Sequence, residues 1–345
     1  DYLTQGKQVE AFEAALCEET GAAHAIAVSS GTAALHLACL ALKLNGAHTA
    51  VCPAITFVAT ANCVRYCGAQ LEMADVDPQT GLVTPNTAPA GADLLLPVSL
   101  TGRVPDLPTL QKHARFTIED AAHSLGASYR SGGAVFASAS CAHTDLATLS
   151  FHPVKAIACG EGGAILTRNS ALAKDLRLLR SHGIAPSPDE IPWHYDQHSL
   201  GFNYRMNELQ AALGLSQLKK LSQFIQRRRE LAERYCNELR QNISSKQLVP
   251  TPFDPNSAYH LFVVHLPNSM QRDKLHIALK KRGILTQVHY KPVYSHSNFS
   301  PFRFNTLAGA EAYFKGCLSI PLYPSMTDAE HQQVIQTLIQ EVTGL

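Results

Sequence analysis

The segment Ser150-Phe151-His152-Pro153-Val154-Lys155-Ala156-Ile157-Ala158-Cys159-Gly160-Glu161-Gly162-Gly163 decides the fold. Two apolar runs flank it, residues 147–151 and 164–167, and they predict two strands on either side of a glycine-rich turn. Lys155 follows an aromatic residue and a proline just ahead of this turn, so we expect it to be held rigidly at a loop tip. A solvated surface lysine in a turn is the alternative for this residue taken alone.

A lysine held in this way has a chemical use. Burial and neighbouring cations lower the pKa of a lysine from its free value of about 10.4, which makes a neutral, nucleophilic amine available. Such an amine forms a Schiff base with a carbonyl group. Lys155 is therefore a candidate nucleophile, and its role depends on the rest of the chain.

Helix and strand patterns alternate through the first two thirds of the chain. We expect helices over residues 9–19, 33–42 and 57–66, and strands over residues 24–28, 50–52, 94–98 and 116–120. Strands that alternate with helices predict an α/β sheet covered on both faces.

The pattern changes in the C-terminal third. A long helical stretch, residues 207–239 with a brief interruption near Leu221, leads into a different order of elements. We expect a strand over 261–266, a helix over 272–282, a strand over 283–288 and a closing helix over 328–342. A chain of 345 residues is too long for one small core. We therefore predict a large domain, residues 1–240, and a small α+β domain, residues 241–345.

The composition excludes several classes of protein. The chain is 46% hydrophobic and carries 29 basic and 28 acidic residues, so its charge favours neither nucleic acid nor an anionic membrane. No apolar run approaches the roughly 20 residues of a membrane helix. Nine cysteines without metal-site spacing indicate free thiols in a reducing cytoplasm, and the 16 histidines offer no complete ligand set, so we expect no metal.

Ser30, Gly31 and Thr32 stand between a predicted strand and a predicted helix. Free N–H groups and the positive end of the helix dipole at such a point bind phosphate, and a glycine permits close approach. The alternative is an ordinary helix N-cap, because serine and threonine are common there without any ligand.

Asp120 ends an apolar strand and is followed by Ala121, Ala122 and His123. Ligands of α/β sheets bind at the C-terminal ends of the strands, and a carboxylate there could pair with the protonated pyridine nitrogen of a pyridoxal cofactor. The alternatives are a helix N-cap for Asp120 and simple packing beside the strand for His123. As a ligand, His123 would hydrogen-bond a phenolate.

Four motifs occur in a characteristic order, namely Thr56-Phe57-Val58-Ala59-Thr60, Glu119-Asp120-Ala121-Ala122-His123, Ser150-Phe151-His152-Pro153-Val154-Lys155 and Gly201-Phe202-Asn203-Tyr204-Arg205-Met206. Together they resemble the DegT-type sugar aminotransferases, which are pyridoxal-phosphate enzymes of fold type I acting on nucleotide-linked keto sugars. The resemblance covers essentially the whole chain, from residues 1–6 to residues 320–324. It implies a mixed, mostly parallel seven-stranded sheet in the large domain.

The resemblance also implies roles for single residues. Lys155 would bind pyridoxal 5'-phosphate as a Schiff base and then move a proton, and Asp120 would keep the ring nitrogen protonated. Phe57 would stack on the ring, although an aromatic residue on an apolar helix is often part of the core. His123 would face the ring hydroxyl. The phosphate would be held by Ser30, Gly31, Thr32 and Ser150.

A second group of residues is matched to the substrate and to a partner subunit. Asn203 matches a residue that reaches the phosphate from the neighbouring subunit, which implies a homodimer with shared active sites; a turn asparagine is the alternative. Residues near the sugar would be Thr4, Gln5 and Gly6, and residues near the nucleotide would be His289 and Tyr290. Both of these segments could equally be structural, the first as the entry to a helix and the second as a strand end.

Within this family the chain most resembles the transaminases of pseudaminic acid biosynthesis. Residues 1–6, 151–155 and 213–218 carry that similarity. It implies UDP-4-keto-6-deoxy-N-acetyl-β-L-altrosamine as the substrate and L-glutamate as the amino donor.

Four other functions are alternatives to this one. A pyridoxamine-dependent sugar dehydratase would have histidine at the position of Lys155, although His152 lies three residues upstream. An aminotransferase for another UDP- or dTDP-linked 4-keto hexose stays open, because variable loops build the sugar pocket. A pyridoxal-binding regulator would need a DNA-binding module, and none precedes the fold in this sequence. A Rossmann dehydrogenase would need a GxGxxG motif after its first strand.

Overall fold

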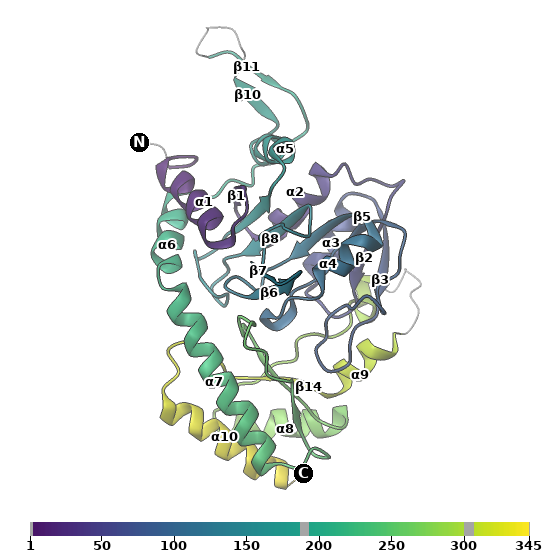
Figure 1. Cartoon of the computed structure of the whole chain (residues 1–345), viewed down its shortest axis with the longest axis vertical. Coiled ribbons are helices and arrows are strands. Elements are labelled where there is room, and N and C mark those ends of the chain that lie inside the picture. The colour runs from purple at the N-terminus through teal and green to yellow at the C-terminus, as the bar shows by residue number, and fades with distance from the viewer. Residues whose placement is uncertain (1–2, 187–192, 300–306, 345) are drawn as a thin grey trace.

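The computed structural model describes residues 3–186, 193–299 and 307–344. Asp1 and Tyr2, which begin the N-terminal motif, lie outside the described residues. A large sheet with helices on both sides occupies one part of the molecule, and a smaller group of helices and strands lies beside it (Figure 1). Helix α7 (Leu221–Asn242) runs along one side of the smaller group.

The large sheet has seven strands in the order β1-β9-β8-β5-β4-β2-β3. Their bounds are β1 His24–Val28, β9 Gly163–Thr167, β8 Leu146–Ser150, β5 Ala114–Asp120, β4 Ala92–Leu95, β2 Thr49–Pro53 and β3 Gln70–Ala74. Neighbours from β8 to β3 pair in parallel, whereas β9 is antiparallel to both β1 and β8. The predicted mixed, mostly parallel seven-stranded sheet is confirmed.

Both faces of this sheet are buried, as its apolar strands require. Along β1, Ile26 and Val28 pack on one face against α2 (Gly31–Ala41), α3 (Val58–Tyr66) and α5 (Ser170–Arg180). Ala25 and Ala27 pack on the other face against α1 (Lys7–Thr20) and α6 (Glu208–Leu218). The alternation follows from the two-residue period of a strand. In this arrangement the C-terminal ends of β5 and β8 lie beside the N-terminus of α2.

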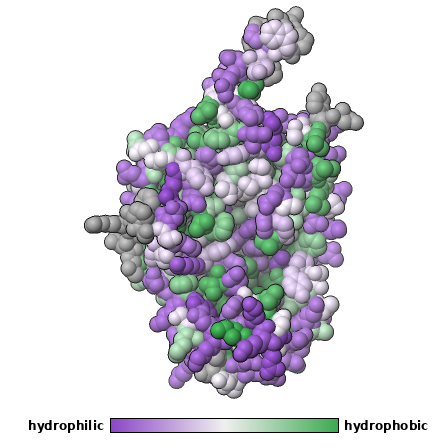
Figure 2. Space-filling view, turned by 180° about the vertical axis from the view of Figure 1, so that it is seen from behind, coloured by the Kyte–Doolittle hydropathy of each residue, from purple (hydrophilic) through white to green (hydrophobic). Residues whose placement is uncertain are grey.

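Short elements decorate the large sheet. These are α4 (Leu107–Leu110) and the hairpins β6 (Ser128–Ser131) with β7 (Ala134–Ala137) and β10 (Ile184–Pro186) with β11 (Tyr195–Gln197). The β10–β11 hairpin stands clear of the body of the molecule in Figure 1 and in the view from behind in Figure 2. A two-stranded ribbon without a packed face is marginal by itself.

The smaller group is built around the antiparallel sheet β12-β13-β14. Its elements are β12 (Val249–Pro250), β13 (Phe262–His265), α8 (Ser269–Lys281), α9 (Ala308–Gly316), β14 (Cys317–Ile320) and α10 (Asp328–Thr343). A separate core joins this sheet to α7, α8 and α10. The long helical stretch is interrupted between α6 and α7, near Leu221 as predicted. The division of the chain at residue 240 stays a prediction.

The predicted strand over residues 283–288 is wrong. Only Gln287 pairs there, in an isolated bridge with Ser319, and the third strand of the small sheet is β14 instead. Leu285 is 72% exposed, so the apolar run that suggested a buried strand does not pack into the core. β14 has all four residues buried, which is why it and not the earlier run completes the sheet. Among the described residues, no helix is long and apolar enough to cross a membrane.

Candidate active site

A cavity of about 440 Å³ opens where β5 and β8 end and where α2 and α3 begin. Every residue that was matched to the cofactor lines it, except Asn203. The lining residues of this set are Ser30, Gly31, Thr32, Phe57, Asp120, His123, Ser150 and Lys155, joined by His289 and Tyr290 from the C-terminal third. Residues distant in sequence thus meet at the edge where α/β sheets bind ligands.

One end of this cofactor cavity is shaped for a phosphate. Ser30 caps α2, since its Oγ accepts from the N–H of Ala33 at 3.1 Å. Gly31 and Thr32 are the first two residues of the helix, and the N–H groups at such positions have no partner within the helix. A Cβ on Gly31 would lie 2.8 Å from the Cβ of Ser150, so only glycine fits there. The N-cap and the phosphate-binding interpretations are therefore compatible.

Asp120 is the last residue of β5 and is 5% exposed. Its Oδ2 accepts from Thr60 Oγ1 at 2.7 Å, and its Oδ1 accepts from the N–H of Ala122 at 3.2 Å. Burial raises the pKa of this carboxyl, while the two donors and the nearby Lys155 lower it. A turn and not a helix follows Asp120, so the helix N-cap alternative is wrong. A cation placed in the cavity would favour the ionised carboxylate.

Lys155 lies in the loop after β8 and is half-buried between this cavity and a second one. Its N–H donates to the carbonyl of His152 at 2.9 Å, which tightens the loop. Burial lowers the pKa of the Lys155 amine to about 8, and the charge of Asp120 opposes this shift. A substantial neutral fraction near physiological pH is what a nucleophilic lysine needs. The solvated-surface alternative is wrong.

His123 is buried beside Asp120 and is held on two sides. Its Nδ1 accepts from the N–H of Thr101 at 3.3 Å, and its Nε2 lies 3.4 Å from the hydroxyl of Tyr290. Burial depresses the pKa of this imidazole, so the ring is neutral. Since Nδ1 accepts a hydrogen bond, the proton of the neutral ring is on Nε2. His123 thus offers an N–H donor to an oxygen in the cavity.

Phe57 immediately precedes α3 and is 56% exposed, although it is a large aromatic side chain. It lines the cofactor cavity, and its ring centroid lies 6.1 Å from that of Tyr290. The core alternative for Phe57 is therefore wrong. An exposed ring at a cavity wall provides an apolar face on which a planar group can stack.

The remaining predicted residues lie outside this cavity of the described chain. Asn203 is exposed and pairs with Ser181 in an isolated bridge, and the side chain of Gln5 donates to Ser181 Oγ at 3.1 Å. Thr4 pairs with Asn207, and the N–H of Gly6 donates to Glu208 Oε1 at 3.0 Å. Thr4 and Gly6 thus contact the start of α6, whereas Gln5 and Asn203 contact Ser181 at the end of α5. Their roles stay predictions, because each would need a second subunit to reach a cofactor.

Two residues of the site were not assigned from the sequence. Thr60 had a visible signal, because it follows Thr56 by one helical turn and their hydroxyl oxygens lie 2.8 Å apart. His260 stacks on His123 with ring centroids 4.3 Å apart, but it comes from a segment 137 positions later in the chain. No local sequence pattern predicts that contact. Within the described ranges, no group of three His, Cys, Asp or Glu residues could hold a metal ion.

The residues present fit a planar, phosphorylated pyridine aldehyde. They provide helix N–H groups for the phosphate, an aromatic face for the ring, a carboxylate for the ring nitrogen, an N–H donor for the ring oxygen and an amine. The bound group would supply an electron sink for chemistry at the carbon next to an amine. This fold and site define the class of pyridoxal-phosphate-dependent aminotransferases.

Comparison with known proteins identifies the family within that class. The model of the DegT/DnrJ/EryC1/StrS aminotransferase family matches residues 1–339. PseC from Helicobacter pylori, an aminotransferase involved in the biosynthesis of pseudoaminic acid, is 29% identical with a TM-score of 0.90, over 99% of this chain and 93% of PseC. The chain belongs to the DegT/DnrJ/EryC1/StrS family and is a sugar aminotransferase that uses pyridoxal phosphate.

Two further solved structures agree with this assignment. NtdA from Bacillus subtilis, solved with bound cofactor PMP, is 30% identical with a TM-score of 0.87, over 99% of this chain and 78% of NtdA. DesV from S. venezuelae, solved in complex with a ketimine intermediate, is 28% identical with a TM-score of 0.87, over 98% of this chain and 90% of DesV. The predicted family, enzyme class and cofactor are confirmed.

Proposed function

We propose that this enzyme transfers the amino group of L-glutamate to C4 of UDP-4-keto-6-deoxy-N-acetyl-β-L-altrosamine in pseudaminic acid biosynthesis. The similarity to PseC along almost the whole chain supports this choice of sugar. The single observation that carries the transamination is Lys155, a half-buried amine at the wall of a cavity that also holds Asp120. Free thiols at all nine cysteines support a reducing cytoplasmic location.

Each polar side chain of the cavity has a task in this proposal. Lys155 Nζ would take up and return the proton that moves during the transfer, which its lowered pKa allows near neutral pH. Asp120 would hold the ring nitrogen in its protonated form, and the hydrogen bond from Thr60 favours the ionised carboxylate and fixes its orientation. His123 Nε2 would donate to the ring oxygen. The first N–H groups of α2, with Ser30 and Ser150, bind the phosphate.

The dehydratase alternative requires a different base at the position of Lys155. The candidate would be His152, which is exposed and lies 3.9 Å from Glu161, where it is paired on the outer wall of the cavity. Lys155 occupies the inner position between Asp120 and the C-terminal third. This arrangement favours transamination over dehydration.

We also propose a homodimer in which Asn203 reaches the phosphate of the partner's cofactor. Asn203 is exposed in the segment that precedes α6, outside the cavity of its own chain. Large exposed apolar side chains occur near the N-terminus, in and after the β10–β11 hairpin and on α6, namely Leu3, Trp193, Tyr195, Leu200 and Leu209. The projecting β10–β11 hairpin stands on the same side of the molecule as α1 (Figure 1). A second copy of the chain would cover this surface and complete each site.

Subunit complementation tests the shared site. Lys155→Ala and Asn203→Ala variants, each inactive or weak alone, are unfolded or subunit-exchanged together and their mixture is assayed. In a mixed dimer one site combines an intact lysine with an intact asparagine, so activity should return above the sum of the two variants. If the mixture, with exchange verified by mass, stays at that sum, Asn203 does not act across subunits.

The reaction is tested with the purified protein and a panel of sugars. The enzyme should be yellow, L-glutamate should bleach the absorption band, and UDP-4-keto-6-deoxy-N-acetyl-β-L-altrosamine should restore it and yield an amino sugar. Other UDP- and dTDP-linked 4-keto hexoses form the comparison set. Turnover of one of those in preference to the altrose-configured sugar would remove the pseudaminic assignment and leave transamination intact. A colourless protein that stays colourless with added cofactor would remove both.

A further inference from the structure

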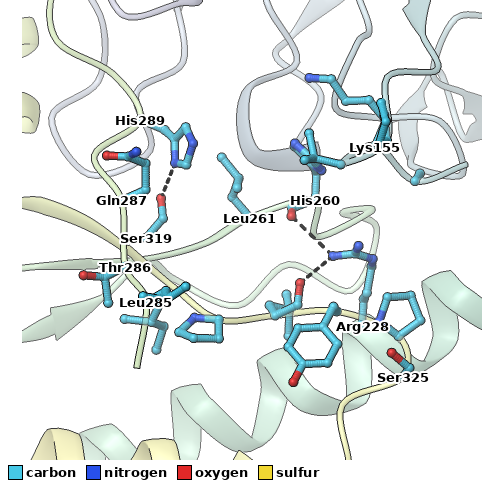
Figure 3. Close-up of a pocket in the computed structure, with 18 of the residues that line it drawn as sticks. Lys155, Arg228, His260, Leu261, Leu285, Thr286, Gln287, His289, Ser319 and Ser325 are labelled. Carbon is cyan, nitrogen blue, oxygen red and sulfur yellow. Dashed lines mark hydrogen bonds between the residues drawn. The ribbon is translucent and has the colours of Figure 1, made fainter. Parts of the chain in front are cut away.

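A second cavity, of about 990 Å³, lies on the other side of the Lys155 loop (Figure 3). It is bounded by that loop, by α7 and by segments of the C-terminal third. Lys155, His289 and Tyr290 line both this cavity and the cofactor cavity. The two spaces are therefore neighbours that share a wall at the reacting amine. We call the second one the basic cavity.

The charges of the basic cavity have a single sign. Its ionisable nitrogen groups are those of Lys155, Arg228, His260, His276, Lys280 and His289. No aspartate or glutamate is among its lining residues in the described part of the chain. A cavity of one sign with low-dielectric walls focuses its field and attracts counter-ions. An anion is the ligand that such a field favours.

Arg228 is the most buried of these groups, at 5% exposure. It projects from α7, and its Nη1 donates to the carbonyl oxygens of Tyr259, His260 and Leu322 at 3.0, 3.3 and 2.8 Å. The bond to His260 is drawn in Figure 3. Its buried Nε has no hydrogen-bond partner. Arg228 forms no ion pair with another described residue. Carbonyl oxygens satisfy part of the guanidinium without neutralising its charge.

His260, near Lys155, is also buried and also has a nitrogen without a hydrogen-bond partner. It is 7% exposed, and its Nδ1 is a buried ring nitrogen without a hydrogen-bond partner. Its ring packs on His123, which links the basic cavity to the cofactor cavity. Burial depresses the pKa of His260, and the charges of Lys155 and Arg228 depress it further. Two unpaired polar nitrogens thus stand at the wall of one cavity.

A buried charge without a counter-charge lowers stability unless something else compensates it. Both substrates of a sugar aminotransferase can supply that compensation, because an amino-acid donor carries carboxylates and a sugar nucleotide carries a diphosphate. Each substrate must also bring its reacting atom to Lys155, which forms part of the cavity wall. The cavity volume accommodates ligands of drug size, for which pockets of about 300–1,000 Å³ are usual.

We propose that the basic cavity binds an oxyanion of one of the two substrates, either a carboxylate of the amino donor or the diphosphate of the sugar nucleotide. Arg228 and His260 form its inner end beside the lysine, and Lys280 on α8 forms its rim. This inference rests on the proposed function, since it assigns a subsite to the same reaction. It assigns to the C-terminal third of the chain the binding of the negatively charged group of a substrate.

The first experiment separates the two half-reactions in the cofactor-loaded enzyme. Bleaching of the absorption band by L-glutamate reports the donor step, and its recovery with the keto sugar nucleotide reports the acceptor step. Lys280→Met should raise the KM of one step roughly tenfold, as expected for loss of a hydrogen bond to a charged group. Arg228→Lys, which keeps the charge but loses the planar fork, should raise the same KM. Lys281→Met, an exposed neighbour on α8 outside the cavity, is the matched control.

The second experiment measures binding without turnover. Glutarate and uridine 5'-diphosphate, which carry the two kinds of oxyanion and no reacting group, are titrated calorimetrically into the cofactor-loaded enzyme. One of them should bind roughly tenfold more weakly to Lys280→Met than to the wild type or to Lys281→Met. A donor-step effect with weaker glutarate binding identifies the carboxylate, and an acceptor-step effect with weaker diphosphate binding identifies the nucleotide.

Three results would overturn the inference. Neither probe binds the wild type, Lys280→Met and Arg228→Lys leave both KM values unchanged, or Lys281→Met has the same effect as Lys280→Met. The thermal midpoint of each variant shows whether it is folded. Because the side chain of Lys280 is exposed, its replacement by methionine should not affect folding. Normal bleaching and turnover with any of these results leaves the proposed function in place. A protein without an absorption band fails the proposed function instead.

Discussion

The cofactor cavity and the basic cavity share Lys155 but surround it with opposite chemistry. On one side Asp120 provides a buried carboxylate at the end of β5. On the other side Arg228, His260 and Lys280 are present without any lining carboxylate. The cofactor cavity is suited to a cationic ring nitrogen and the basic cavity to an anion. One lysine therefore stands between a place for the cofactor and a place for charged substrate groups.

The two cavities also differ in how the chain builds them. Strand ends and helix starts of the large sheet supply most of the cofactor cavity, with each short motif near a single element. The basic cavity combines the Lys155 loop with α6, α7, α8 and three further segments of the C-terminal third. Element ends converge because of sheet topology, whereas the basic cavity depends on how the C-terminal third packs. The first kind of site is readable from local sequence and the second is not.

Replacing the shared residue should have the largest effect. Lys155→Ala removes the amine that we propose binds the cofactor carbonyl and moves the proton, so the absorption band should vanish. Turnover should fall on the order of 10²–10⁴-fold from the loss of proton transfer alone. Absorption spectra and single-turnover assays check this. Retention of the band in Lys155→Ala would show that the cofactor is bound to another amine. Lys155 would then not be the reacting group that the two cavities share.

Replacing the carboxylate should damage one cavity and spare the other. Asp120→Asn removes the charge that pairs with a protonated ring nitrogen, which costs about 2–5 kcal/mol when a buried charge pair loses one member. We expect weaker cofactor binding and a turnover reduced roughly 30-fold or more. Titration with glutarate and uridine 5'-diphosphate should give unchanged affinities, because Asp120 does not line the basic cavity. A change in those affinities would show that the two cavities act as one.

The sequence predicted the cofactor cavity well because its parts lie at element boundaries. Gly31 at a helix start, Asp120 at a strand end and Lys155 before a glycine run each mark a change of secondary structure. The structure brings all three to one cavity. Element bounds and sheet class followed from the same alternation of strands and helices.

The sequence missed features that depend on tertiary packing. Residues 283–288 have the composition of a strand, but β14 completes the small sheet and leaves Leu285 exposed. His260 immediately precedes the predicted strand over residues 261–266, and only the tertiary packing of this segment places its ring on His123. Arg228 lies in the middle of three consecutive arginines of α7, yet the residue is buried under three carbonyl oxygens. Helical periodicity shows that one face is polar but not which of its cations is covered.

Removing one hydroxyl near Asp120 should have the smallest effect and should act through pH. Thr60 Oγ1 donates to Asp120 Oδ2 at 2.7 Å, and this bond favours the ionised carboxylate. Thr60→Val keeps the shape and loses the donor, which costs about 1.5–3 kcal/mol for a hydrogen bond to a charged group. The pKa of Asp120 then rises, because burial is opposed by one donor fewer. Since the reaction needs the ionised form, the acid limb of the kcat profile should move to higher pH.

Thr117→Val provides the matched control for that variant. Thr117 is a buried threonine on the same strand as Asp120, and it lies outside the cofactor cavity. Its replacement should leave the acid limb where the wild type has it. A pH-independent loss of activity in Thr60→Val would mean that the threonine only shapes the cavity wall. A shift confined to Thr60→Val would instead show that the buried carboxylate of the cofactor cavity, Asp120, is tuned by its hydrogen-bond donors, whereas no carboxylate lines the basic cavity in the described part of the chain.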